Sequence, residues 1–392
     1  MRSLQLAWKY IKFHRGKTLT LIACITLTLF LPIALTILIS QFNQEMVARA
    51  RSTPFVVGAK GSKLDLIFHA LYFNTEQQTL TTYGQVAEIE GDGLATAYPI
   101  HAGFTLRQVP IVGTSLDYFD FRRLRVGEGE MIARVGDCVL GHNVARKLEL
   151  KIGDRPMSDS ENVLDIAGAY PLRLTVVGIF EKTNSADDEA IFVDLKTAWV
   201  LEGKGHGHQD IAEVAEENLL SSEGNNKIAS AAVQPYLEVD DENVTDFHFH
   251  GDRNEFPISA IIVRPKDEMS ATFLLDRLGA EESAVQMVQP LDEVGKLMAL
   301  VFKIQKFFNA NAVLLGASTL LFLGLVIFLS LRLRKNEMET MFKLGCSRGT
   351  IAWMQISELA LIFLFSMVIL AFLSWLVYYF APELVKWLLE IQ

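Results

Sequence analysis

The stretch TLTLIACITLTLFLPIALTILIS, residues 18–40, contains no charged side chain. A helix needs roughly 20 apolar residues to cross a bilayer, because its backbone polar groups must be paired inside the helix. A secretory leader would have an apolar region of about 7 to 15 residues followed by small residues. Here the polar residues Gln41-Phe42-Asn43-Gln44 follow a longer run. We therefore predict an uncleaved first transmembrane helix over residues 18–40.

Two further apolar runs, residues 311–332 and 359–380, predict a second and a third transmembrane helix. Residues 1–17 carry Lys and Arg but no acid, and basic residues outnumber acids in the loop at residues 333–358. Since cytoplasmic segments are rich in Lys and Arg, both are predicted to be cytoplasmic. Residues 41–310 and the tail at residues 381–392 are then periplasmic or otherwise extracytoplasmic.

The segment at residues 41–310 alternates strand-like runs, such as Cys138–Leu140 and Ala190–Val193, with helical ones, such as Leu195–Leu201. The predicted fold class is a membrane α-helical protein with a large extracytoplasmic α+β domain and three visible transmembrane helices. Acidic residues outnumber basic ones by about 16 in this segment, which disfavours nucleic acids as partners and favours cations.

Three smaller segments have distinct characters. Residues 1–17 have an amphipathic helical pattern, typical of a helix in the membrane interface or of a basic flank that sets the orientation. Residues 202–256 are rich in acids, Gly and His and are predicted to be a partly flexible insertion. Residues 291–310 have helical spacing and lead into the second span, which predicts a stalk helix.

Histidine and aspartate recur at alternate positions within the insertion. Imidazoles and carboxylates are zinc ligands, and alternate residues of an extended segment share one face. Surface histidines in polar loops usually bind nothing, so an ordinary solvated loop is the competing interpretation. The candidate metal ligands are His206, His208, Asp210, His248, His250 and Asp252.

Two motif matches lack the context that their chemistry needs. Gly16-Lys17-Thr18 lacks the earlier glycine of a phosphate-binding loop and precedes a membrane span instead of following a strand. Gly345-Cys346-Ser347-Arg348-Gly349 fits the spacing of a serine-hydrolase elbow but lies between two predicted spans. We predict neither nucleotide binding nor catalysis by this chain, and no catalytic residue is assigned.

The cytoplasmic loop, KNEMETMFKLGCSRGTIAWM, predicts a charged helix, a glycine turn and a second helix that Ser347 caps. A plain connecting loop is the alternative. In this loop the chain resembles membrane subunits of ABC transporters of the MacB, LolC and FtsX type, which carry a motif similar to E-I-x-x-L-R-A-L-G-A-S-R. The order of the predicted parts along the chain is similar too. On this resemblance, the candidate positions for coupling to an ATPase are Glu337, Met341, Phe342, Leu344, Gly345, Ser347 and Arg348.

The resemblance implies a permease subunit in a bacterial inner membrane that works as a homodimer. It implies a separate cytoplasmic ATPase that uses ATP-Mg, with residues 337–351 as the coupling element and no cofactor in this chain. The zinc hypothesis rests on the histidine pattern of the insertion alone. The family has four spans, whereas this sequence shows three. The periplasmic partner implied is an adaptor, a lipoprotein or a cell-wall hydrolase, for export, extraction or transmembrane signalling.

A different class of function is also open at this point. A stand-alone membrane receptor or metal sensor would use the His-bearing insertion to bind its ligand and the cytoplasmic loop to carry the signal. Association with an ATPase distinguishes the permease from the receptor.

Overall fold

The computed structural model describes residues 2–74, 79–159, 171–207, 219–223, 226–229, 236–240, 242–280 and 283–390. The chain divides into two compact units. One is helical and comprises residues 1–45 and 296–391, and the other comprises residues 46–295. Much of the insertion predicted at residues 202–256, including His208 and Asp210, lies outside the described residues.

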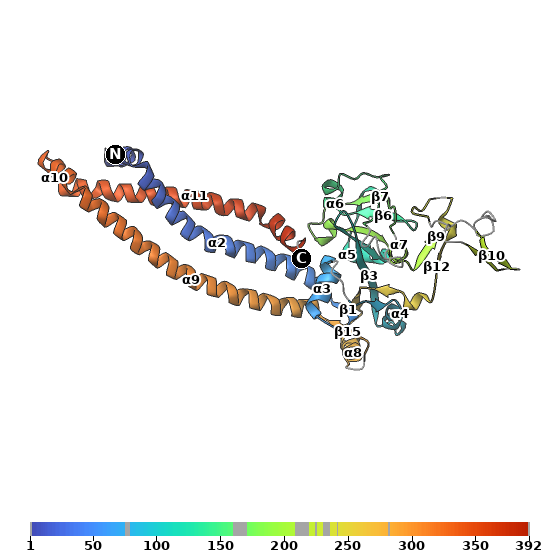
Figure 1. The fold of residues 1–392 in the computed structure, drawn as a ribbon. Helices are drawn as coiled ribbons and strands as arrows, with labels where there is room; N and C mark the ends of the chain where they lie inside the picture. Colours follow the sequence, from blue (N-terminus) through green and yellow to red (C-terminus); the bar gives the residue numbers. More distant parts are fainter. Residues whose placement is uncertain are drawn as a thin grey trace. The chain divides into compact units, whose positions relative to one another are not determined.

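The helical unit is built from long helices (Figure 1). Among the described residues, three helices, α2, α9 and α11, are long and apolar enough to cross a membrane. The helices that contribute to this unit are α1 (Arg2–Phe13), α2 (Arg15–Arg51), α9 (Pro290–Leu333), α10 (Lys335–Lys343) and α11 (Arg348–Glu390).

Two of these helices extend beyond the predicted spans. The α9 helix covers both the predicted stalk at residues 291–310 and the second apolar run without a break. The α11 helix continues past residue 380 through Pro382, so the described part of the tail is helical. A proline inside a helix removes one backbone hydrogen bond and tends to kink the helix at that point.

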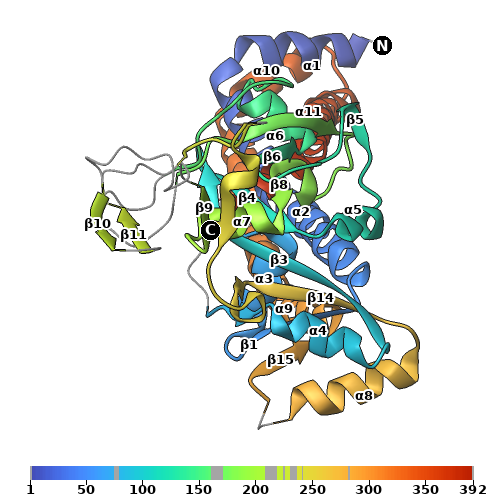
Figure 2. The same ribbon diagram turned by 90° about the vertical axis from the view of Figure 1, so that its right-hand side faces the viewer.

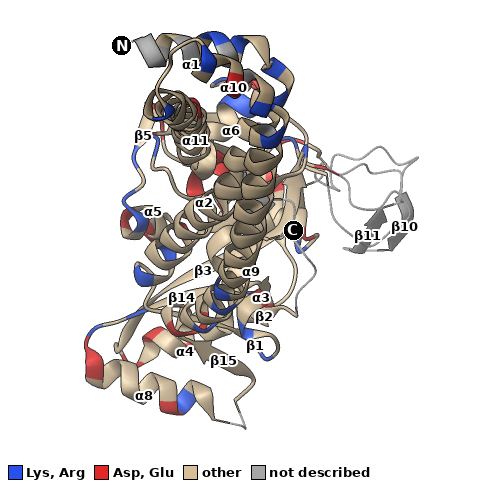
Figure 3. Cartoon of the chain, turned by 90° about the vertical axis from the view of Figure 1, so that its left-hand side faces the viewer, with Lys and Arg blue, Asp and Glu red and all other residues tan. Residues whose placement is uncertain are grey.

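The amphipathic N-terminal segment forms α1, which packs against α11. The Trp8 and Phe365 rings lie 5.7 Å apart, and Ile11 is buried with Leu21 and Ile362. Lys and Arg are prominent on α1 and α10 (Figure 3). Trp8 and Ile11 of α1 therefore contact neighbouring helices of this unit.

The second unit is α+β. Within the described residues its main sheet is nine-stranded, in the order β15-β1-β14-β3-β4-β8-β6-β7-β5, with parallel pairing of β4 with β8 and of β6 with β7. These strands are β1 (Phe55–Ala59), β3 (Ala95–Leu106), β4 (Val109–Thr114), β5 (Val126–Gly129), β6 (Asp137–Leu140), β7 (Thr175–Phe180), β8 (Ile191–Asp194), β14 (Ala260–Pro265) and β15 (Val285–Val288).

Short helices cover this sheet, and Figure 2 shows α4 and α8 beside β14 and β15. The helices are α3 (Lys63–Tyr72), α4 (Gly84–Gly91), α5 (Leu116–Arg122), α6 (His142–Lys147), α7 (Leu195–Leu201) and α8 (Glu268–Gly279), with a 3-10 turn η1 (Ala186–Glu189). Three small ribbons pair β2 (Thr81–Thr82) with β13 (Pro257–Ile258), β9 (Gly205–Gly207) with β12 (Phe247–Phe249), and β10 (Leu219–Glu223) with β11 (Asn226–Ala229).

Successive side chains of a strand point to opposite faces of the sheet, and both faces are packed. In β8, Ile191 and Val193 join a core with Cys138, whereas Phe192 packs against Tyr118 and Phe180. Successive strand residues face opposite sides, which explains the separation. Cys138 is fully buried in this core, and the three cysteines are free.

Candidate functional site

The cytoplasmic loop of the prediction is a helical hairpin whose turn is fixed by backbone hydrogen bonds. The N–H of Cys346 donates to the Met341 carbonyl at 3.1 Å, and the N–H of Gly345 donates to the Phe342 carbonyl at 3.0 Å. This is the Schellman arrangement that ends many helices. Gly345 has φ of +94°, a conformation that a residue with a Cβ rarely adopts. The glycine therefore ends α10 where the sequence predicted a turn.

The second helix of the hairpin begins at Arg348 and is capped by Ser347. The Ser347 Oγ accepts the N–H of Thr350 at 3.2 Å, which confirms the predicted cap. On the facing helices, the Gln355 side chain donates to the Met338 sulfur at 3.1 Å. Residues 335–351, which we call the coupling hairpin, are thus shaped by local contacts.

The coupling hairpin leaves large apolar side chains in solvent. Leu344 is 80% exposed and Phe342 is 51% exposed, and the Arg348 guanidinium lies 5.4 Å from the centre of the Phe342 ring. Arginine is enriched among the energetically important residues of protein interfaces, and exposed apolar side chains gain from burial when a partner binds. Met341 is partly buried and Ser347 is exposed, and Glu337 lies in α10 with its side chain outside the described part.

A buried ion pair lies at the base of the hairpin, within the helical unit. The Arg334 Nη1 donates to Glu358 at 3.1 Å, and the Lys17 Nζ lies 3.8 Å from the same carboxylate. Lys17 lies near the start of α2, Arg334 lies between α9 and α10, and Glu358 lies within α11, so these contacts connect the three segments. We did not assign Glu358 from the sequence, although an acid at the edge of an apolar run commonly has a partner.

A second buried polar cluster holds the end of α2 in the unit of residues 46–295, which we call the outer unit because the sequence predicts it to be extracytoplasmic. The Arg49 guanidinium donates to the Asp187 carboxylate through two nitrogens, to the Leu71 carbonyl at 3.0 Å and to the Tyr118 hydroxyl at 3.3 Å. Tyr118 in turn donates to Asp187 at 2.9 Å, and so does the Ser185 hydroxyl. We call these residues the α2 anchor. The sequence alone did not reveal it.

The charge state of the α2 anchor follows from its contacts. Burial by itself would raise the pKa of Asp187, but the Arg49 charge and its hydrogen bonds lower that pKa to about 2. Burial and the nearby Asp187 charge raise the pKa of Tyr118 to about 12. Asp187 is therefore ionised and Tyr118 is neutral at physiological pH.

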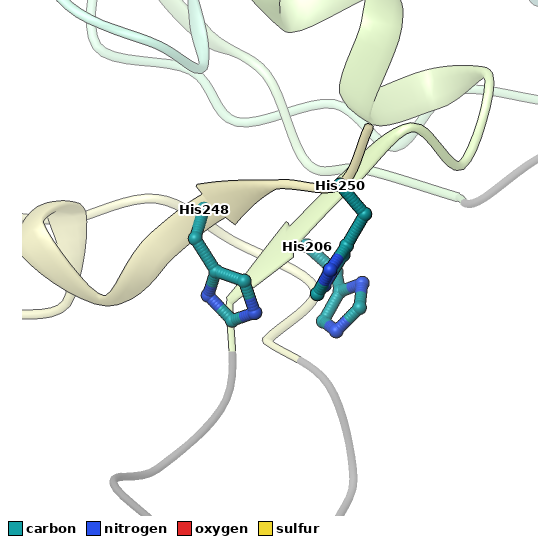
Figure 4. A group of neighbouring side chains, drawn as sticks. All are labelled: His206, His248 and His250. Carbon is teal, nitrogen blue, oxygen red and sulfur yellow. The ribbon is translucent and has the colours of Figure 1, made fainter. Parts of the chain in front are cut away.

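Three of the predicted metal ligands lie together on the β9–β12 ribbon. One ring nitrogen from each of His206, His248 and His250 lies within 4.8 Å of the other two, and Figure 4 shows the three rings gathered. Asp252 has another role, since its carboxylate caps the N–H of Asn254 at 2.9 Å. His208 and Asp210 lie outside the described residues.

Comparison with known proteins gives a family match over more than half of the chain. Residues 18–241 match the model of the MacB-like periplasmic core domain. No curated protein matches.

Three of the solved structures with some similarity are a periplasmic region, an extracellular domain and a domain of a permease. The periplasmic region of MacB from Actinobacillus actinomycetemcomitans is 10% identical, with 65% of this chain and 98% of that chain covered and a TM-score of 0.35. The extracellular domain of the transporter YknZ from Gram-positive bacteria is 12% identical (60% and 98% covered, TM-score 0.32). A domain of a permease from Porphyromonas gingivalis is also 12% identical (60% and 86% covered, TM-score 0.28).

Proposed function

Because this chain belongs to the family of ABC transporter permeases with a MacB-like periplasmic core domain, we propose that it couples ATP hydrolysis by a separate cytoplasmic ATPase to movement of its outer domain. The proposal places the chain in a bacterial inner membrane, with α2, α9 and α11 as spans and residues 1–17 in the cytoplasm. The outer unit then lies in the periplasm, and the permease works as a homodimer.

The observation that carries the proposal is the continuity of α2 and its fixed end. This helix contains the first apolar run and continues to Arg51, and Arg49 near its end is locked by the α2 anchor. Breaking such a buried pair costs several kcal/mol, so the helix end and the outer unit should move together. A displacement of α2 in the membrane would thereby reach the outer unit.

The coupling hairpin supplies a surface for the ATPase. Its backbone is fixed by the Gly345 turn and the Ser347 cap, while Phe342, Leu344 and Arg348 remain exposed. Pre-formed backbone with exposed anchor side chains lowers the entropy lost on binding. The proposed contact is therefore an apolar pocket on the ATPase that accepts Leu344 and Phe342.

The proposal is tested by co-purification. The full chain, tagged in its native host and extracted from the membrane in mild detergent, should recover an ATP-binding-cassette protein in a stable complex whose ATPase activity depends on the permease. Recovery of the permease alone, with both proteins present in the membrane fraction, would contradict the proposal.

A receptor or metal sensor is the second candidate, and the histidine group of the β9–β12 ribbon favours it. The two candidates differ in what the cytoplasmic hairpin binds. A permease requires an ATPase there, whereas a sensor would bind a signalling protein that does not hydrolyse ATP.

A further inference from the structure

Two glycine–phenylalanine pairs determine the register of the β9–β12 ribbon. Gly205 lies opposite Phe249 and Gly207 lies opposite Phe247. A Cβ on either glycine would lie 2.6 Å from a ring atom of the facing phenylalanine, so the rings cover the glycines on one face. Phe247 and Phe249 also pack against the core of the outer unit. The ribbon therefore has one apolar face that packs on the core, and a slip by one residue would turn both rings away from it.

That register places the histidines on the opposite face. His206 and His248 are direct cross-strand partners, and His250 follows two residues later on the same face. The His250 N–H donates to the Lys204 carbonyl at 3.1 Å, which extends the pairing beyond the strands. The three ring centres are 4.7 to 4.9 Å apart.

The hydrogen bond of His248 sets which of its ring nitrogens carries the hydrogen. Its Nδ1 lies 2.9 Å from the Asp246 carbonyl oxygen. A carbonyl only accepts, so Nδ1 carries the hydrogen and the lone pair is on Nε2. A histidine that ligates a metal commonly donates its other N–H to a backbone carbonyl in this manner.

We propose that His206, His248 and His250 bind one divalent transition-metal ion of the Zn²⁺ class. Three imidazoles suit Zn²⁺, Cu²⁺, Ni²⁺ and Co²⁺ and are poor ligands for Ca²⁺ or Mg²⁺. Nitrogens around a tetrahedral Zn²⁺ are about 3.3 Å apart, so the observed spacing within 4.8 Å closes by side-chain rotation. In the described part of the chain the group contains no carboxylate or thiol, which leaves a coordination position for water or an exchangeable ligand.

This inference is independent of the ATPase proposal. The site lies entirely in the outer unit, on a ribbon whose other face is fixed to the core, and it would hold its ion whether or not an ATPase binds the hairpin. A failure of the zinc titration would therefore leave the ATPase proposal standing, and a failure of the co-purification would leave the metal site standing.

The test uses the full chain in detergent, purified through a tag without histidine, stripped of metal and titrated with Zn²⁺ by calorimetry. We expect one ion per chain. Replacing His206 or His248 by Ala should weaken binding by about tenfold or more, whereas His142→Ala, which removes a histidine of α6 outside the group, should leave it unchanged. Equal affinity in all three variants would overturn the proposal and show an adventitious ion only.

A second measurement does not depend on any variant folding. Histidines of the wild-type protein are modified with diethyl pyrocarbonate, with and without Zn²⁺, and each site is quantified by mass spectrometry. We expect Zn²⁺ to protect His206, His248 and His250 but not His142. The absence of any selective protection would also overturn the proposal.

Discussion

The α2 anchor and the coupling hairpin each fix a helix end, but by opposite means. Asp187 is 3% exposed and is held by side chains that are distant in sequence, whereas the hairpin is held by backbone bonds between neighbours and leaves Leu344 in solvent. The first arrangement stabilises one conformation. The second keeps apolar side chains available for a partner. A substitution should therefore damage stability in the anchor and association in the hairpin.

The largest expected effect is that of Asp187→Asn. It leaves the Arg49 charge buried without its carboxylate, which should destabilise the outer unit by about 3–5 kcal/mol. Hydrogen exchange of the β8 amides, followed by mass spectrometry, measures the loss. The matched control Asp120→Asn changes an exposed acid on α5 and should stay within about 0.5 kcal/mol of wild type. Similar exchange in both variants would show that the anchor contributes nothing.

The second-largest expected effect is the pH dependence of the stability that Asp187 contributes. The pKa of Asp187 is lowered to about 2 in the folded protein from 3.8, so the native state binds fewer protons than the unfolded state. The stabilisation is complete above about pH 4 and is lost as the pH falls toward 2, a change of about 2 kcal/mol. Wild type should therefore lose stability more steeply than Asp187→Asn across this interval. Parallel curves would contradict the assignment.

In the hairpin the expected loss is of binding. Leu344→Asp places a charge in the proposed apolar contact and should weaken ATPase association at least about tenfold, close to 1.4 kcal/mol. Its stability should be unchanged because Leu344 is exposed. Met269→Asp, an equally exposed residue of α8 in the outer unit, is the control. Equal loss of ATPase binding in both variants would show that the hairpin is not part of the interface.

The smallest effect is that of Ser347→Ala, which removes the cap of α11 and should cost about 1 kcal/mol locally. Faster amide exchange at residues 350–352 measures it. Ser347→Asp, which retains a capping oxygen, should behave as wild type. If the aspartate variant frays as much as the alanine variant, the cap does not determine the start of the helix.

Local features could be predicted from the sequence because their causes lie within a few residues. The Ser347 cap and the Gly345 turn follow from residue types at fixed offsets. The strand at Cys138–Leu140 follows from an apolar run that is bounded by turn residues. The sequence does not show, however, that this strand, β6, pairs in parallel with β7.

Distant contacts could not be predicted in the same way. Arg49 and Asp187 are ordinary charged residues in the sequence, and only the folded chain brings them together over 138 positions. The alternation of His248 and His250 predicted a shared face, but the pairing of β12 with β9 was needed to bring His206 beside them. Asp252 is a residue type that binds zinc, which is why the pattern included it, but in the structure its carboxylate caps a 3-10 helix.

The central claim is that the coupling hairpin and the outer unit are exposed on opposite sides of a membrane. Cys346 in the hairpin is a natural reporter, and the substitution Met269→Cys supplies a second thiol in the outer unit. With a membrane-impermeant maleimide applied from the periplasmic side, the account predicts labelling of the introduced thiol alone, and labelling of Cys346 only after the inner membrane is permeabilised. Labelling of both thiols from the same side of an intact membrane would contradict it.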